Sequence, residues 1–255
     1  MMKVITDLHT HILPGIDDGA KDPEESWLLL NAQAKQGVSR IVFTPHFNIT
    51  RNSVESFIVN RENSLKRMLN NCNFGSLELD YHLGAEVFFS IDLVKADLQS
   101  LCINDTRYIL VELPMEKKPE GLTYILLNII NSGYIPIIAH VERYSYITGN
   151  PLILYNLIYN GCLAQINCKT IIQDNNRSKM AIKFIKWGLV QFICSDCHSI
   201  IHRPPNMEEG LKALKKTIGN EKVLRLIDNS NRVFENKDIE IEELIKPTNF
   251  LGIWL

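Results

Sequence analysis

Short apolar runs recur along the chain and are separated by longer segments in which apolar residues follow helical spacing. Each run is bounded by polar or turn-forming residues, a pattern typical of buried β-strands. Seven such runs occur, at residues 4–9, 40–44, 79–89, 108–113, 135–140, 162–166 and 189–194. A helix-like pattern follows each of them. The alternation predicts parallel strands that are joined by helical crossovers.

Several helix boundaries are marked in the sequence. Asp22 is a suitable N-cap, with a proline directly after it and Glu25 three residues on, and Gly37 suits the far end of the same helix. Residues 53–71 and 207–219 carry apolar side chains on one face only, as amphipathic helices do.

The strand pattern indicates a sheet that is covered on both faces. Residues 135–139 are almost continuously apolar, as in parallel sheets flanked by helices. A closed barrel and an open doubly wound sheet both fit, and in both the chemistry gathers at the C-terminal ends of the strands. No low-complexity tract, charge block or Pro/Gly-rich linker divides the 255 residues, so we expect one domain over residues 1–255.

Charge and hydropathy argue against nucleic-acid and membrane proteins. A net charge of −2 gives no general basic field to attract nucleic acid. The most apolar stretch, residues 121–141, contains Asn128, Asn131, Gly133 and Pro136, so it fits a helix, a turn and a strand better than a membrane span. The first residues do not resemble a signal peptide, and six cysteines in a chain of this size are expected as reduced thiols. Together these features predict a cytoplasmic protein.

Metal-binding types of side chain gather where the predicted strands end. They are His9, His11, His46, Glu86, Glu112, His140, Asp196 and His198. Residues i and i+2 of a strand point to the same side, about 6.5 Å apart along the chain. His9 and His11 can therefore converge on one centre. Asp17 and Asp18 follow in the loop after the first strand.

Acidic groups that converge at one end of a sheet need compensation. They would repel one another and lose hydration at high cost, which divalent cations offset. Mixed histidine and carboxylate ligands suit Mn, Fe or Zn better than Ca or Mg. A single histidine or glutamate at a strand end is more often a solvated group than a ligand. Because independent strands deliver such residues to the same end, the pattern as a whole predicts a metal site.

Several short motifs resemble those of the polymerase and histidinol phosphatase (PHP) superfamily: "DLHTH", "TPH", "GAE", "VELP", "AHVERY" and "SDCH". "DLHTHILPGIDDGAKD" and "AHVERY" further resemble the bacterial manganese-dependent protein-tyrosine phosphatases of capsule and exopolysaccharide operons. The resemblance covers residues 3–235, and the order and spacing of the motifs agree. It implies an α/β fold, a distorted seven-stranded (β/α) TIM-like barrel with a metal site at the C-terminal strand ends.

The resemblance also implies three divalent metal ions, with Mn expected and Fe or Zn as alternatives. The first ion would take His9, His11, Glu86 and Asp196. The second would share Glu86 and add Glu112 and His140, and the third would take Asp18, His46 and His198. Asp17 is adjacent to Asp18, and only the motif favours Asp18.

The implied reaction is hydrolysis of a phosphomonoester by a hydroxide that bridges two metals. Arg143 and Arg203 would stabilise charge on the phosphate oxygens, because guanidinium groups match phosphate geometry. Without the motif, each arginine would be interpreted as half of a surface ion pair. The family implies that the substrate is phosphotyrosine on the tail of a membrane tyrosine kinase, which the enzyme reaches without inserting into the membrane.

Other interpretations stay open. A small-molecule phosphatase such as histidinol phosphatase, a nuclease, or a metal-stabilised scaffold without turnover would share these residues. Cys197 and Arg203 have the Cys-x5-Arg spacing of thiol-based tyrosine phosphatases, but no glycine lies between them and we interpret the match as chance. "CSDC" has the spacing of a redox pair or half a zinc site, although burial of Cys194 is the better interpretation. The apolar residues 249–255 are expected to fold back on the barrel, with a homo-oligomer contact as the alternative.

Overall fold

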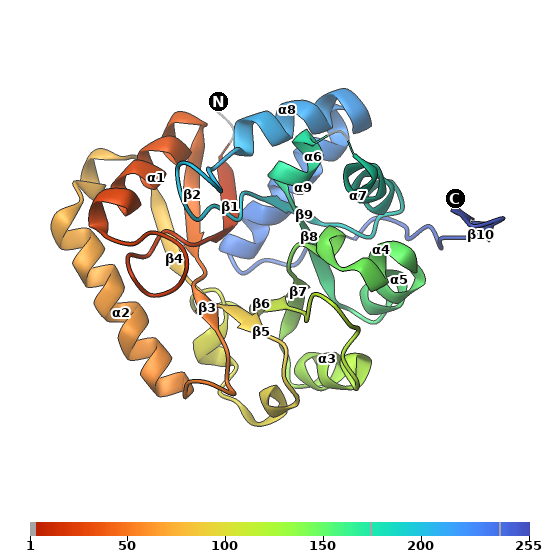
Figure 1. Ribbon diagram of the computed structural model, residues 1–255, viewed down its shortest axis with the longest axis horizontal. Coiled ribbons are helices and arrows are strands. Elements are labelled where there is room, and N and C mark those ends of the chain that lie inside the picture. The colour runs from red at the N-terminus through yellow and green to blue at the C-terminus, as the bar shows by residue number, and fades with distance from the viewer. Residues whose placement is uncertain (1–3, 174, 240) are drawn as a thin grey trace.

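Short parallel strands follow one another around the molecule, and the helices lie outside them (Figure 1). The computed structural model describes residues 4–173, 175–239 and 241–255. The barrel strands are β1 (Ile5–Thr10), β2 (Val38–Phe43), β3 (His46–Phe47), β4 (Asp80–Leu83), β5 (Glu86–Phe88), β6 (Tyr108–Glu112), β7 (Ile135–Ile138), β8 (Leu163–Asn167) and β9 (Phe192–Cys194). All neighbouring pairs among them are parallel, as predicted.

The predicted strand over residues 79–89 is wrong as a single element, because Gly84 and its neighbour divide it into β4 and β5. The neighbouring strand is also interrupted. Its two parts, β2 and β3, are separated at Pro45, which has no backbone N–H to donate to the sheet. The Pro45 carbonyl still accepts from the backbone N–H of Glu86 at 3.0 Å. His46 and Glu86 therefore remain register partners in β3 and β5 beyond the break.

The barrel closes between its last and first strands. The backbone N–H of Asp196 donates to the carbonyl of His9 at 3.0 Å, and that of His11 donates to the carbonyl of Cys197 at 2.9 Å. If β2 with β3 and β4 with β5 are each counted as one interrupted strand, the structure is a distorted seven-stranded barrel. Its strands are β1, β2/β3, β4/β5, β6, β7, β8 and β9. This confirms the predicted α/β TIM-like fold, and it excludes an open doubly wound sheet, whose outer strands do not pair with each other.

Helices surround the barrel, and several begin and end where the sequence predicts. They are α1 (Pro23–Lys35), α2 (Val54–Asn71), α3 (Leu122–Asn131), α4 (Ser145–Gly149), α5 (Leu152–Tyr159), α6 (Cys168–Ile172), α7 (Asn176–Lys186), α8 (Met207–Ile218) and α9 (Asn220–Phe234). Asp22 caps α1 by accepting from the Glu25 N–H at 2.9 Å, and Gly37 takes φ = +81° just beyond its end. Helices α2 and α8 match the predicted amphipathic segments.

One predicted crossover helix is wrong. Between β5 and β6 the described residues form only the short 3-10 turns η2 (Ile91–Lys95) and η3 (Gln99–Leu101). Leu93 and Leu98 are both buried but lie five residues apart, so one α-helix would direct them to different faces. Leu93 within η2 and Leu98 directly before η3 are both buried in this arrangement.

The barrel interior is apolar below its C-terminal end. Leu110 and Leu163 belong to a buried cluster inside the strands, which Phe234 of α9 helps to close. Glu112 follows Leu110 by two residues on β6, so it points to the same interior but nearer the mouth. This alternation places polar side chains at the mouth of the barrel, above an apolar interior. Among the described residues, no helix has the length and apolar character needed to cross a membrane.

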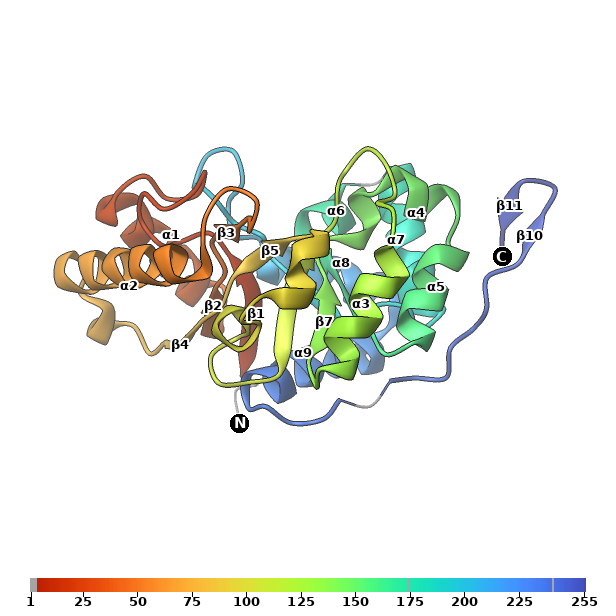
Figure 2. The ribbon, with the colours of Figure 1, turned by 90° about the horizontal axis from the view of Figure 1, so that it is seen from below.

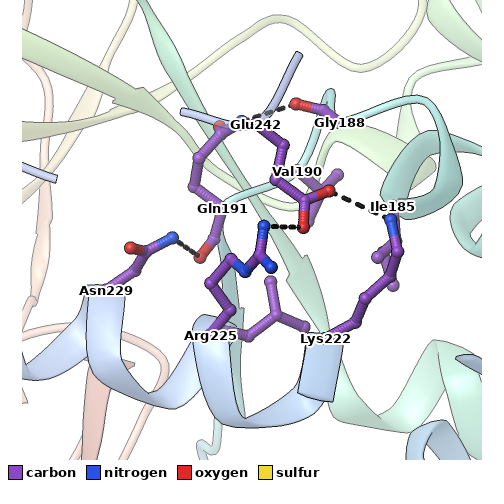
Figure 3. A pocket seen from close by; sticks show the side chains of 9 residues that line it. Ile185, Gly188, Val190, Gln191, Lys222, Arg225, Asn229 and Glu242 are labelled. Carbon is purple, nitrogen blue, oxygen red and sulfur yellow. Dashed lines mark hydrogen bonds and ion pairs between the residues drawn. The ribbon is translucent and has the colours of Figure 1, made fainter. Parts of the chain in front are cut away.

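The C-terminal segment leaves α9, runs along the outside of the barrel and ends in the hairpin β10 (Asn249–Phe250) and β11 (Ile253–Trp254) (Figure 2). Glu242 holds this segment through Lys222 at 3.0 Å and Arg225 at 2.5 Å, beside a cavity of about 20 Å³ that has room for one water (Figure 3). Trp254 Nε1 donates to the Gly149 carbonyl at 3.1 Å. The expected folding back is therefore seen at Trp254.

The rest of the hairpin projects from the barrel. Phe250, Leu251, Ile253 and Leu255 are exposed. The predicted oligomer contact at this segment stays a prediction.

Candidate metal centre

Glu86 lies at the centre of the predicted ligand set. Its Oε2 is 3.2 Å from Nε2 of both His9 and His11 and 2.9 Å from Nδ1 of His46. Its Oε1 is 2.9 Å from Nε2 of His140. The side chain is buried, and it receives histidines from β1, β3 and the end of β7. One carboxylate that faces four rings has the arrangement of a group that bridges several cations.

The other predicted ligands lie around this carboxylate. Potential ligand atoms within 4.8 Å of one another form three groups: His9, His11 and Asp196; His46, Glu86 and Glu112; and His11, Asp18, His46 and His198. His140 Nε2 is 3.8 Å from Glu112 Oε1. The structure therefore brings together all nine predicted ligands, in groups close to the predicted ones. His11 and His46 each belong to two groups, which the sequence did not indicate.

The two adjacent aspartates have different surroundings. Asp18 Oδ1 faces Nε2 of His46 at 3.3 Å and Nε2 of His198 at 3.4 Å. Asp17 lies behind the cluster: its Oδ2 is 2.7 Å from Nδ1 of His11 and also accepts from the backbone N–H of His46 at 3.0 Å. The geometry favours Asp18 as a ligand and Asp17 as the group that orients the His11 ring.

The backbone at two strand ends is strained. His140 and Asp196 take φ = +32° and +53°, a region that non-glycine residues rarely occupy. Such strain persists only where the surrounding structure holds it, and it concentrates at functional sites. Gly19 contributes in another way, since a Cβ there would lie 2.1 Å from the carbonyl oxygen of His11. Only glycine lets this loop close over the end of β1.

One buried oxygen supports a cation at this place. Asp196 Oδ1 finds no hydrogen-bond partner within the part of the chain that the structure describes. It lies 3.5 Å from His9 Nε2, 3.7 Å from His11 Nε2 and 3.5 Å from His198 Nδ1. A buried carboxylate oxygen without a donor is costly. A divalent ion among these atoms would remove that cost, so the residues present fit a metal.

Burial and neighbouring charges set the ionisation of the cluster. Burial would raise the pKa of Glu86 and Asp196, but the surrounding histidines outweigh it and hold both pKa values below the usual range. Burial would lower the pKa of His11, but the Asp17 carboxylate outweighs it and raises that pKa to about 9. Burial and the Glu86 charge raise the pKa of Glu112 to about 7. Protonated rings thus balance the carboxylates, and metal ions would replace their protons.

The two predicted arginines lie at the edge of the cluster. Arg203 NH2 donates to Asp196 Oδ2 at 2.6 Å, and Arg143 NH1 is 3.5 Å from the same oxygen. Both side chains are half-buried. Both line an open cavity of about 600 Å³ over the centre, together with Asp18, His46, Phe47, Asn48, Arg51, Asn52, Glu86, Phe88, Glu112 and Met115.

Sequence reasoning missed several residues at this site. Arg51, Phe88 and Met115 line the cavity but lie outside the motifs. Phe88 follows Glu86 by two residues, so alternation alone places it above the ligand on the same face. Gln165 and Asn167 on β8 contact predicted ligands. Two amides spaced i, i+2 in an otherwise apolar strand were the available signal.

The thiol alternatives find no support in the geometry. All six cysteines lie in the described ranges, and all are buried and free. Burial raises the pKa of Cys197 to about 12, whereas a nucleophilic cysteine needs a lowered pKa. Its Sγ accepts from Nε2 of Gln33, a buried side chain of α1, at 3.5 Å. Burial also raises the pKa of Cys194 well above its usual value, as expected for a core residue.

Comparison with known proteins gives consistent matches. A sequence model of the family "Capsular polysaccharide synthesis, CpsB/CapC" matches residues 5–235. The tyrosine-protein phosphatase YwqE of Bacillus subtilis is 30% identical, covering 91% of this chain and 92% of YwqE. The putative tyrosine-protein phosphatase CapC of Staphylococcus aureus is 32% identical over 92% of this chain and 93% of its own.

Solved structures agree with these relatives. A crystal structure from work on YwqE of Bacillus subtilis and CpsB of Streptococcus pneumoniae, described as metal-dependent tyrosine phosphatases, matches with a TM-score of 0.86 and 27% identity. It covers 96% of this chain and 100% of its own. A lactonase of Listeria monocytogenes, with a TM-score of 0.56 and 11% identity over 93% of this chain and 96% of its own, shares the fold alone.

Proposed function

Because the chain belongs to the CpsB/CapC family of capsular polysaccharide synthesis, we propose that it is a metal-dependent protein-tyrosine phosphatase. This is the family that the sequence motifs indicated. The observation that carries the proposal is the convergence of four histidines on the buried Glu86 carboxylate. Relatives named as tyrosine phosphatases, which match over nine-tenths of the chain, support the assignment of the reaction.

The proposed cofactor is a cluster of three divalent ions, with Mn expected and Fe or Zn as alternatives. The three groups of close ligand atoms support this number. We assign His9, His11, Glu86 and Asp196 to the first ion, Glu86, Glu112 and His140 to the second, and Asp18, His46 and His198 to the third. Nitrogen and oxygen donors without thiolate favour Mn or Fe, and no cysteine is needed in the ligand set.

The bound cations would supply an activated water and would neutralise the phosphate oxygens. The chain's own residues then position the substrate. Arg143 and Arg203 present guanidinium donors beside Asp196, where a phosphate over the centre would meet them. Donors held in place before the reaction stabilise charge that develops on the phosphate oxygens. No cysteine nucleophile is required.

The cavity suits an aryl phosphate on a peptide. It is open to solvent, so a side chain that projects from a flexible segment can reach the centre. Phe88 and Met115 form part of its wall, where an aromatic ring can pack. Arg51 lies on the rim and offers a positive charge to an acidic segment. We propose the phosphorylated tyrosine-rich tail of a membrane tyrosine kinase of capsule synthesis as the substrate.

The organisation of the chain supports one domain over residues 1–255. One buried cluster extends from Ile12 to Ile227 with Trp254 packed against it, and a second lies inside the same barrel. No separate core is seen among the described residues of the C-terminal segment, which lies along the barrel.

The substrate assignment is tested by comparing kcat/KM for phosphotyrosine peptides, phosphoserine peptides and histidinol phosphate at equal metal loading. We expect a clear preference for phosphotyrosine. A preference for histidinol phosphate would move the function to amino-acid biosynthesis. A fully loaded protein without turnover on any of them would indicate a scaffold.

A further inference from the structure

Strand β8 contributes no residue to the proposed ligand set, yet two polar side chains of this strand reach it. Gln165 and Asn167 lie two residues apart and point into the barrel. Gln165 is fully buried and Asn167 is 7% exposed. Buried amides in an apolar strand need partners, and both find them among the proposed ligands.

The orientation of the Gln165 amide is fixed by a backbone donor. The N–H of His140, which can only donate, lies 2.8 Å from Oε1 of Gln165. The atom that it contacts must therefore be the amide oxygen. The amide nitrogen of Gln165 then points the other way and donates to Asn167 Oδ1 at 2.7 Å.

This orientation determines the tautomer of His9. Nδ1 of His9 lies 3.3 Å from the same Oε1, which has no hydrogen to give. The ring must therefore carry its hydrogen on Nδ1 for the contact to be favourable. In the neutral ring, which is the form that binds a metal, the lone pair is then on Nε2, the atom that lies 3.2 Å from Glu86 Oε2 and 3.5 Å from Asp196 Oδ1. A cation at the centre of the cluster would meet this lone pair.

The same donor-to-acceptor direction of hydrogen bonds continues through Asn167 to Asp196. Because Asn167 Oδ1 accepts from Gln165, its Nδ2 donates, and it meets Asp196 Oδ2 at 2.7 Å. Arg203 NH2 donates to that oxygen as well, at 2.6 Å. Oδ2 is thus occupied by donors, while Oδ1 has none in the described chain and faces the histidines. Glu142 Oε1 accepts from the Asn167 backbone N–H at 3.0 Å and fixes the end of β8.

We infer that Gln165 and Asn167 are positioning residues of the metal centre, which set the tautomer of His9 and reserve Oδ1 of Asp196 for a cation. The inference rests on the proposed metal site, and it adds β8 to the strands whose side chains build that site. One backbone N–H, that of His140, sets the direction of the whole chain of hydrogen bonds. Groups that orient ligands in this way typically change metal affinity about 10–100-fold when they are removed.

The test compares Mn²⁺ binding by metal-stripped variants of the full chain. Gln165→Met keeps the length of the side chain but removes both amide functions. Gln191→Met is the matched control, because Gln191 is also a buried glutamine that bonds two backbone groups, Ala164 N–H and the Gly188 carbonyl, and neither of these belongs to a proposed ligand. Gln165→Glu keeps the acceptor for His9 and His140, but it loses the donor to Asn167 and can add a negative charge.

We expect Gln165→Met to weaken Mn²⁺ binding about 10–100-fold and Gln191→Met to leave the affinity unchanged, although both lower the stability of the metal-free protein. Gln165→Glu should bind Mn²⁺ more tightly than Gln165→Met. Equal affinities of Gln165→Met, Gln191→Met and wild type would overturn the positioning role. A wild-type protein that binds no Mn²⁺ would instead contradict the proposed metal site itself.

A second measurement is made on the wild-type protein, and a variant serves only to assign the signal. In Zn²⁺-loaded wild type, ¹⁵N NMR of the histidine rings distinguishes a ring that coordinates through Nε2 and is protonated on Nδ1 from the reverse. His9→Gln assigns the signal. We expect His9 to be protonated on Nδ1, and coordination through Nδ1 would overturn the inference.

Discussion

His11 Nδ1 lies 2.7 Å from Asp17 Oδ2, while Nε2 of the same ring faces Glu86 at 3.2 Å. Asp17 therefore holds the outer side of a ring whose inner side meets the cluster. Asp18, the next residue, faces the cluster directly through His46 and His198. The two adjacent carboxylates thus have different surroundings, and metal analysis can test the separate roles proposed for them.

Asp18→Ala should remove one bound ion, because it deletes a proposed ligand. Asp17→Ala should keep the number of ions at saturating Mn²⁺ but lower the affinity about 10–100-fold, since the His11 ring loses its partner. Metal content per chain, measured across a Mn²⁺ titration, separates the two effects. The reverse pattern would exchange the roles assigned to the two aspartates.

Cys197→Ala should keep most of the turnover. The thiol is fully buried, and burial raises its pKa to about 12, so it is protonated at neutral pH. Steady-state kinetics on a phosphotyrosine peptide measure the effect. A thiol-based mechanism would instead lose nearly all activity in this variant, and a trapped phosphocysteine at this position would decide for that mechanism.

Arg143→Ala should lower kcat about 10²–10³-fold, the usual cost of losing one preorganised donor to developing charge. Metal content should not change, because the guanidinium group is not a ligand. Arg225→Ala is the control: it removes an arginine of α9 that pairs with Glu221 and Glu242, neither of which is a proposed ligand. If only KM rises in Arg143→Ala, the residue binds substrate and transition state equally and the role assigned here is wrong.

Mn²⁺ affinity should rise with pH. The Asp17 carboxylate outweighs burial and raises the pKa of His11 to about 9, and Asp18 and Glu86 likewise outweigh burial at His46 and raise its pKa to about 11. Both rings hold protons at pH 7 in the metal-free protein, and a metal must displace them. The apparent affinity should therefore grow about tenfold per pH unit for each proton released, between pH 6.5 and 8.5. Titrations that give one affinity across this range would contradict the assignment of these rings as ligands.

The barrel and the place of the site could be predicted from the sequence, because period-2 alternation and parallel topology bring all strand C-termini to one end. His9, Glu112 and Asp196 end apolar runs, so their location followed directly. The division of residues 79–89 at Gly84 was not predicted, nor was the break at Pro45 that lies beside it in the neighbouring strand. Local sequence does not show which residue lies opposite across a ladder.

The contacts within the site could not be predicted from the sequence for another reason. Asp17 and Asp18 are chemically identical, and only the turn of the loop decides which one faces the cluster. Gln165 and Asn167 were missed because amides were not counted among metal-binding types. Their roles depend on hydrogen-bond direction, which is set by the backbone N–H of His140 at the end of the neighbouring strand β7.

The central claim is that phosphatase activity depends on the bound metal cluster. The most direct measurement is turnover of a phosphotyrosine peptide by protein whose metal content is determined on the same sample, before and after chelation and after Mn²⁺ is returned. Activity should disappear with the metal and return with Mn²⁺, and Glu86→Ala should not recover, because Glu86 contacts four of the histidines. Full activity in a sample verified to be metal-free would contradict the claim.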